Sequence, residues 1–203
     1  RQLVENGAVG DPQIIKITSR DPGPPPVSYI KSSGGMFLDM TIHDFDMARY
    51  ISGKEVKEVF AKATVKVDPE IAQAGDVDTA VITLTFEDDS MAVIDNCRKA
   101  SYGYDQRLEV FGSKGMARAE NNFPNNHKLS TEEGIRGDLP LHFFLERYDA
   151  SYNQEIREFL DALISGNGMP VDGRDGLISI ALGLAASLSV QENRPVKLKE
   201  ILP

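Results

Sequence analysis

Strict alternation between positions 79 and 97 is the feature of this sequence that most restricts its fold. Two alternating segments in the stretch TAVITLTFEDDSMAVIDNC flank an acidic turn, EDDS. Because a period of two places successive side chains on opposite faces of a strand, the stretch predicts a β-hairpin in a sheet whose two faces differ. In the first strand, one face carries Ala80, Ile82, Leu84 and Phe86, and the opposite face carries Thr79, Val81, Thr83 and Thr85.

The other segments extend this hairpin into a larger sheet with helices. Four more segments are rich in β-branched residues or alternate between apolar and polar residues, which predicts β structure. They are strands at 12–20 and 55–67, a second hairpin at 106–120 that turns at GSKG, and a short strand at 127–134. Helical periodicity predicts helices at 36–52, 149–165 and 175–191, whereas the prolines and glycines of 21–35 predict a long irregular loop. The expected class is α+β: a mostly antiparallel open sheet with helices packed on one face. The Thr-rich opposite face is then free to pair with a second subunit.

Composition narrows the range of partners. The 203 residues carry a formal net charge of −9, which argues against nucleic acid and anionic membranes as partners. The apolar tract 177–190 is too short to span a bilayer and is expected to be a core helix. A single cysteine, Cys97, excludes an internal disulfide and fits a reducing compartment, so we expect a cytoplasmic protein.

Candidate chemistry is concentrated in the helix predicted at 36–52. Asp39, His43, Asp46 and Tyr50 fall within about 60° of one another on a helical wheel, and apolar residues fill most of the remaining circumference. Buried carboxylates and an imidazole are costly unless they are paired or line a wet cavity, so the stripe predicts the wall of a polar pocket. There His43 can take a proton from a substrate hydroxyl, while Asp39 holds the imidazole tautomer or binds a neighbouring hydroxyl.

Two other interpretations of the stripe compete with proton transfer. In the first, His43 is a satisfied core histidine and Asp46 pairs with Arg49. In the second, Asp39, His43 and Asp46 bind a metal ion, although the remaining imidazoles, His127 in a surface loop and His142 in a packing position, lack metal-type spacing. Cys97 has no adjacent histidine and is interpreted as a small strand residue.

The stretch GGMFLDMTIHDFDMARYISG, residues 34–53, resembles the signature helix of the Gfo/Idh/MocA oxidoreductase family. GDPQIIKITSRDP, YGYDQRLEVFGSKGMA and ERYDASYNQEIREFLDALISG extend the resemblance along nearly the whole chain, in the order that the family uses. The resemblance implies that residues 1–203 are the C-terminal substrate-binding and oligomerisation domain of a two-domain, NAD-dependent dehydrogenase. It also implies a homotetramer.

The resemblance assigns roles to particular residues. It makes Asp39 and His43 catalytic and implies that Tyr104, Asp21 and Arg20 help to bind the substrate. It further implies a substrate that is a cyclic polyol or sugar, one hydroxyl of which is oxidised as in the conversion of myo-inositol to the 2-ketone. Asp46 and Arg49 match the family pattern but are interpreted as structural.

The chain departs from the family in what it lacks. No G-x-G-x-x-G occurs in it, and the family's Glu-Lys-Pro segment is also missing, so we expect the N-terminal Rossmann domain to lie outside residues 1–203. The opening residues read as the tail of a helix, which suggests a piece of a longer protein. We therefore expect no NAD site, no metal and no turnover in these residues alone. Alternatives are a non-enzymatic sugar-binding or oligomerisation module, and a related sugar dehydrogenase or reductase.

Overall fold

A seven-stranded sheet forms the centre of the molecule, for which a computed structural model describes residues 1–202. The strand order is β6-β5-β1-β4-β3-β2-β9, and every neighbouring pair is antiparallel except β1 and β4. The strands span Pro12–Arg20 (β1), Val56–Thr64 (β2), Thr79–Phe86 (β3), Met91–Cys97 (β4), Asp105–Gly112 (β5), Gly115–Ala119 (β6) and Val196–Lys197 (β9). The predicted α+β class and mostly antiparallel sheet are confirmed.

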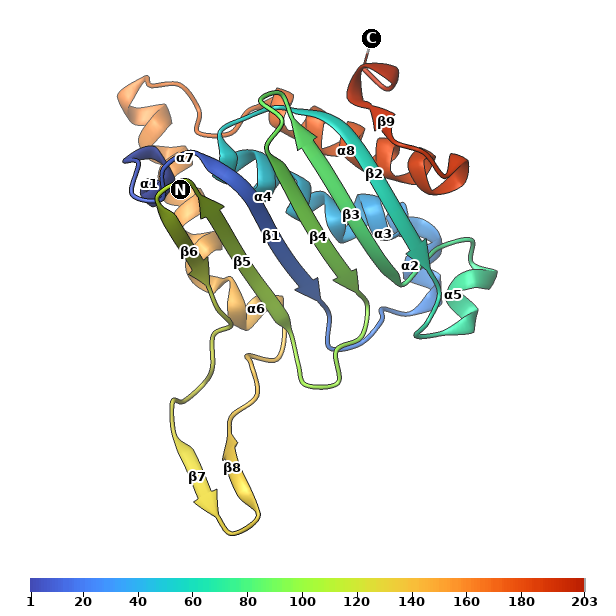
Figure 1. The fold of residues 1–203 in the computed structure, drawn as a ribbon, viewed down its shortest axis with the longest axis vertical. Coiled ribbons are helices and arrows are strands. Elements are labelled where there is room, and N and C mark those ends of the chain that lie inside the picture. The colour runs from blue at the N-terminus through green and yellow to red at the C-terminus, as the bar shows by residue number, and fades with distance from the viewer. Residues whose placement is uncertain (203) are drawn as a thin grey trace.

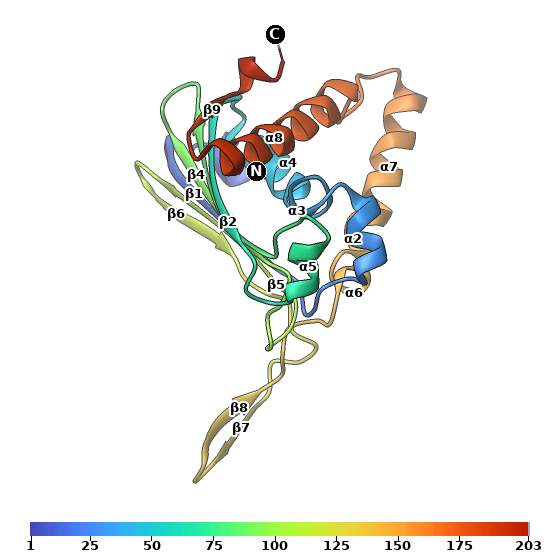
Figure 2. The ribbon, with the colours of Figure 1, turned by 90° about the vertical axis from the view of Figure 1, so that its right-hand side faces the viewer.

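Helices cover one face of the sheet and leave the other open (Figures 1 and 2). They span Gln2–Glu5 (α1), Val27–Ser33 (α2), Met36–Asp39 (α3), Thr41–Ser52 (α4), Pro69–Gln73 (α5), Phe144–Arg147 (α6), Asp149–Ser165 (α7) and Gly173–Glu192 (α8), and a 3-10 turn, η1, spans Leu198–Glu200. By length and composition α8 is apolar enough to cross a membrane, but it packs against β2, α3 and α4. It is the core helix that its sequence predicts.

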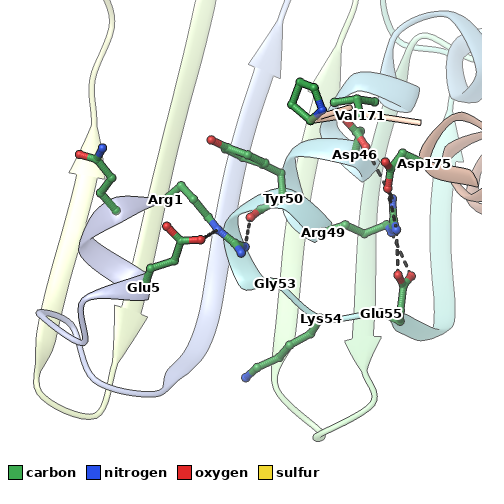
Figure 3. Close-up of a pocket in the computed structure, with 12 residues that line it drawn as sticks. Arg1, Glu5, Asp46, Arg49, Tyr50, Gly53, Lys54, Glu55, Val171 and Asp175 are labelled. Carbon is green, nitrogen blue, oxygen red and sulfur yellow. Dashed lines mark hydrogen bonds and ion pairs between the residues drawn. The ribbon is translucent and has the colours of Figure 1, made fainter. Parts of the chain in front are cut away.

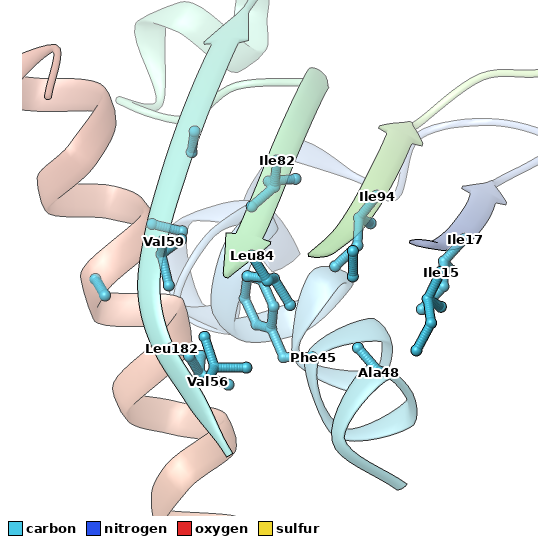
Figure 4. Packing of buried hydrophobic residues seen from close by; sticks show 14 of the residues in the cluster. Ile15, Ile17, Phe45, Ala48, Val56, Val59, Ile82, Leu84, Ile94 and Leu182 are labelled. Carbon is cyan, nitrogen blue, oxygen red and sulfur yellow. The ribbon is translucent and has the colours of Figure 1, made fainter. Parts of the chain in front are cut away.

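The core lies between the sheet and the layer formed by α3, α4 and α8 (Figure 4). Phe45 of α4 and Leu182 of α8 are fully buried there, together with inward residues of the central strands such as Ile82 and Ile94. The alternation in β3 is confirmed: Ala80, Ile82, Leu84 and Phe86 are all buried, whereas Val81 on the opposite face is half exposed. Each buried Leu or Ile side chain contributes about 1.5–3 kcal/mol to folding, so this interface supplies much of the stability.

The structure corrects the prediction of one continuous helix at 36–52. The chain forms α3 and α4 with a break at Met40. The hydroxyl of Thr41 lies 3.4 Å from the carbonyl oxygen of Met36 and 2.7 Å from Oδ1 of Asn96 on β4. This tertiary contact draws Thr41 toward the sheet, and a threonine hydroxyl that bonds to the main chain competes with regular helical hydrogen bonds.

The prediction that residues 21–35 are wholly irregular is also wrong. The prolines are confined to the first part of this segment and end at Pro26, which caps α2. Val27–Ser33 contains no proline or glycine and forms two helical turns, which end at Gly34 in the left-handed region (φ 91°). A proline-rich start therefore did not exclude a helix later in the same segment.

Two further differences concern the second half of the chain. The segment predicted as one strand at 127–134 is a separate hairpin of β7 (Lys128–Thr131) and β8 (Gly134–Gly137), which projects from the body in Figure 1. Helix α7 has the predicted bounds, but its apolar stripe is exposed, because α7 stands away from the sheet in Figure 2.

Candidate functional site

The exposed imidazole of His43 marks the candidate site. His43 lies in the first turn of α4 and makes no side-chain hydrogen bond within residues 1–202. Met47 and Tyr50, one and two turns further on, are 43% and 56% exposed, so this face of α4 is open rather than enclosed. The interpretation of His43 as a satisfied core histidine is therefore wrong. A free, accessible imidazole can reach a bound molecule and serve as a general base.

Asp39 is the last residue of α3 and lies four residues before His43. Its Oδ1 accepts a hydrogen bond from the hydroxyl of Tyr29 on α2 at 2.6 Å, and its Oδ2 lies 3.2 Å from Nη1 of Arg98. The Asp39 side chain is 17% exposed. Within the described residues it forms no hydrogen bond with His43, so its ordering partners are Tyr29 and Arg98 rather than the imidazole.

Two further carboxyl groups lie beside this site, Asp44, which is buried, and Asp21, which is partly exposed. Asp44 is 6% exposed, and its Oδ2 accepts a hydrogen bond from Nδ2 of Asn96 at 2.8 Å. Burial raises the pKa of Asp44 to about 7; the Asn96 hydrogen bond opposes the rise, and the negative charge of Asp21 adds to it. Burial likewise raises the pKa of Asp21 to about 6, which the cation of Arg98 opposes and the charge of Asp39 reinforces. Both acids are therefore partly protonated near neutrality.

Tyr104 belongs to the same cluster. Its ring makes edge-on contacts with Phe143 and Tyr148, at centroid distances of 5.4 and 6.2 Å. Burial raises the pKa of Tyr104 well above its usual value, and Tyr148, Asp21 and Asp44 add to the rise. The Tyr104 hydroxyl therefore remains protonated and can donate a hydrogen bond.

Arg20 is the one predicted site residue that the structure does not bring to this cluster. The side chains of β1 alternate, so Ser19 is buried under the helices whereas Arg20 lies on the open face of the sheet. There its Nε donates to Oδ1 of Asp95 at 2.6 Å and its Nη1 donates to the hydroxyl of Tyr102 at 2.9 Å. Its guanidinium is already committed to neighbours in the sheet.

The interpretation of Asp46 as a partner of Arg49 is confirmed. Their closest charged atoms are 3.7 Å apart, and Arg49 also binds Glu55 and Asp175. This network lines a hollow of about 480 Å³ between α1, α4 and the start of α8, shown in Figure 3, which contains neither Asp39 nor His43. Within residues 1–202 no group of three His, Cys, Asp or Glu side chains is arranged to hold a metal ion.

Sequence reasoning missed Tyr29, Arg98 and the burial of Asp44. A signal existed for Arg98, because the inward positions of β4 continue with a period of two into the residues that follow. Ala92, Ile94 and Asn96 are buried, and Arg98 is the next position in that series. No comparable pattern marked Tyr29, whose position depends on α2 forming inside the segment predicted to be irregular.

The domain is thus a helix-covered α+β sheet that carries an accessible histidine, several aspartates and a tyrosine next to one another. A family model described as the GFO/IDH/MocA C-terminal domain matches residues 1–118, and the chain belongs to this family.

Relatives in the family give the comparison more detail. The myo-inositol 2-dehydrogenase of Thermotoga maritima is 55% identical over 202 residues, which are 100% of this chain and 60% of the relative. The inositol 2-dehydrogenase of Rhizobium meliloti is 46% identical over 98% of this chain and 60% of its own length. The chain thus spans about 60% of the length of these curated relatives.

Solved structures of dehydrogenases have the same fold as this chain. A probable dehydrogenase from Thermotoga maritima superposes with a TM-score of 0.96 at 56% identity, covering 98% of this chain and 60% of that one. The scyllo-inositol dehydrogenase of Lactobacillus casei, solved with NAD(H) and scyllo-inositol, gives a TM-score of 0.88 at 32% identity, with coverage of 98% and 60%.

Proposed function

We propose that residues 1–203 form the substrate domain of an NAD-dependent oxidoreductase that oxidises one hydroxyl of a cyclic polyol of the myo-inositol type. The observation that carries the proposal is a group of neighbouring side chains in which the charge of Asp39 raises the pKa of Asp21 and the charge of Asp21 raises that of Tyr104. Asp39 itself lies four residues before the free imidazole of His43. Acids and hydroxyls suit a neutral substrate with many hydroxyl groups. The inositol dehydrogenases among the relatives support this substrate class.

In the proposed mechanism, His43 takes the proton of the hydroxyl that is oxidised. Asp39 accepts a hydrogen bond from an adjacent hydroxyl and, with Tyr104 and Asp21, orients the ring so that the reacting carbon faces the cofactor. A bound nicotinamide would supply the acceptor for the hydride that leaves this carbon.

We propose that the dinucleotide site lies mainly outside the residues of this chain. The sequence contains no G-x-G-x-x-G, and the GSKG stretch forms the turn between β5 and β6 rather than a strand-to-helix loop. We therefore propose that the cofactor is held mainly by a further domain of the whole protein, and that residues 1–203 alone do not turn over substrate.

Replacing His43 tests the proposed base. In the full-length protein, His43→Ala should lower kcat with myo-inositol and NAD by about 10²–10⁴-fold, because the proton acceptor is lost. His127→Ala is the matched control, since His127 is exposed and its charged partner at the hairpin is Asp138. Near-normal turnover by His43→Ala would show that another group is the base.

A panel of substrates separates the proposed function from its alternatives. Oxidation of myo-inositol or scyllo-inositol by the wild-type protein supports an inositol dehydrogenase, whereas preference for glucose or another aldose supports a related sugar dehydrogenase. Binding of polyols without NAD reduction by the full-length protein supports a non-enzymatic module.

The open face of the sheet supports self-association as a further part of the proposal. This face carries a set of half-exposed apolar side chains on β3–β6: Val81, Met91, Phe111 and Met116. Exposed apolar patches of this kind often mark subunit interfaces. We propose a cytoplasmic homotetramer in which this face is buried; light scattering should give a smaller species for Phe111→Arg than for wild type.

A further inference from the structure

Arg98 is a buried cation next to the candidate site. It follows β4 directly, its backbone N–H donates to the carbonyl oxygen of Asp78 at 2.9 Å, and its side chain is 1% exposed. Removing a guanidinium from water is costly, and the cost is recovered only when every donor finds a good partner.

The partners of Arg98 are two carboxylates, and they satisfy it incompletely. Nη1 lies 3.2 Å from Oδ2 of Asp39, and Nη2 lies 3.7 Å from Oδ2 of Asp76. Nε and Nη2 of Arg98 and Oδ2 of Asp76 form no hydrogen bond. An ion pair with unmatched donors contributes poorly to stability compared with apolar packing, so stability alone does not account for an arginine here.

The contacts of Arg98 fix both ends of α3. Asp76 Oδ1 accepts the backbone N–H of Met36, the first residue of α3, at 3.0 Å, and Asp39 is the last residue of α3. Gly35 before the helix has φ 79°, and a Cβ there would lie 2.9 Å from Oδ1 of Asp76. The turn before α3 is therefore built around Asp76, and Arg98 connects it to Asp39.

The second oxygen of Asp39 has a different kind of partner. Tyr29, whose hydroxyl donates to Oδ1, is 49% exposed and lies on the short helix α2. One oxygen of Asp39 is thus bound to a buried cation. The other accepts a hydrogen bond from the hydroxyl of an exposed residue, and water can compete for that bond.

We propose that Arg98 is a positioning residue that fixes the Asp39 carboxylate so that Oδ1 accepts a hydroxyl of the substrate, in the place that the Tyr29 hydroxyl occupies in the free protein. This inference rests on the proposed polyol oxidation. A polyol hydroxyl and a phenol are the same kind of donor to a carboxylate, so one can replace the other without a change in the acceptor. Arg98 itself does not touch the substrate.

A double-mutant cycle in the full-length protein tests whether Arg98 acts through Asp39. With myo-inositol and NAD, Arg98→Gln should lower kcat/KM by about 10²-fold through a displaced Asp39. On an Asp39→Asn background the same change should lower it less than about threefold, because the carboxylate that Arg98 positions is already gone. Arg98→Lys, which keeps a cation but loses the fork, should recover part of the loss.

Arg49 provides the matched control. It is also a buried arginine bound to carboxylates, but its partners Asp46, Glu55 and Asp175 make no contact with Asp39 in the described residues. Arg49→Gln should lower the melting temperature and leave kcat/KM within about threefold of wild type.

The outcomes separate this inference from the proposed function. Wild-type protein without activity on inositols refutes the proposed function, and this inference with it. Two results with an active wild type refute this inference alone. In the first, the losses of kcat/KM caused by Arg98→Gln and by Asp39→Asn multiply in the double variant; in the second, Arg98→Gln lowers the melting temperature and leaves kcat/KM unchanged. If Arg98→Gln does not fold, the cycle of Arg98→Lys with Asp39→Asn decides in the same way.

Tyr29→Phe tests the second half of the inference. The substitution removes a competing donor without changing the ring, so the KM for myo-inositol should fall by about two- to fivefold while kcat stays the same, in line with the loss of one exposed hydrogen bond. A raised KM would overturn this assignment and would mean that the Tyr29 hydroxyl binds the substrate itself.

Discussion

Asp44→Asn should change how the stability of the protein depends on pH. The Asp44 carboxyl is buried among α4, β1 and β4, with Asn96 as its hydrogen-bond donor, and the charged residues that affect its pKa, Asp21 and Asp95, are both acidic. Burial raises its pKa from 3.8 to about 7. Between these values the folded state binds a proton that the unfolded state has released, so the stability contributed by this group is greatest below pH 3.8 and is lost as the pH rises to about 7.

The size of the effect follows from that difference. At 1.36 kcal/mol for each pH unit, the difference between 3.8 and about 7 corresponds to about 4 kcal/mol, taken as an upper limit because the site can relax when it ionises. Asparagine has the same shape, retains an oxygen that accepts from Asn96, and never ionises. The free energy of unfolding of Asp44→Asn should therefore rise relative to that of wild type by up to about 4 kcal/mol between pH 4 and pH 8.

Urea unfolding followed by circular dichroism at several pH values measures this difference. Titrating groups that do not interact with Asp44 are present in both proteins, so their contributions cancel in the difference. Asp88→Asn is a control of opposite sign: the hydrogen bond from Lys54 lowers the pKa of Asp88 to about 2, so the effect of that substitution should be constant above pH 5. If the curves of wild type and Asp44→Asn run parallel between pH 4 and pH 8, the buried carboxyl does not titrate as argued.

Three further substitutions test the packing that holds the site. Gly183→Ala should destabilise the protein by about 1–3 kcal/mol in thermal unfolding. A Cβ at this position would lie 2.5 Å from Cδ2 of Leu38 and 3.0 Å from the Phe37 carbonyl oxygen. A stabilised variant would show that α8 and α3 separate freely. Asp78→Ala should cost about 3 kcal/mol or more, because the buried carboxylate accepts three backbone N–H groups after β2; an unchanged urea midpoint would contradict this. Phe45→Ala should cost about 3–5 kcal/mol by the same assay, and a loss below 1 kcal/mol would mean that the core collapses into the space.

The sequence predicted those parts of the fold that follow from local periodicity. The alternation of β3 and β4 predicted both the hairpin and its buried face, and a 3.6-residue repeat predicted the bounds of α7. These signals are reliable because strand and helix geometry alone decides which side chains share a face. The break at Met40 could not be found in this way, since it depends on Thr41 reaching Asn96, a residue 55 positions away.

The same distinction between local and tertiary information applies to the candidate site. The sequence by itself determined that Asp39 and His43 lie four residues apart in a mostly helical segment, although the break at Met40 falls between them. Only the tertiary structure decided that the Asp39 carboxylate binds Tyr29 and Arg98, that Asp44 is buried, and that Arg20 lies on the opposite face of the sheet. The physical reason is that burial and ion pairing depend on segments brought together by packing, about which the spacing of residues along one helix carries no information.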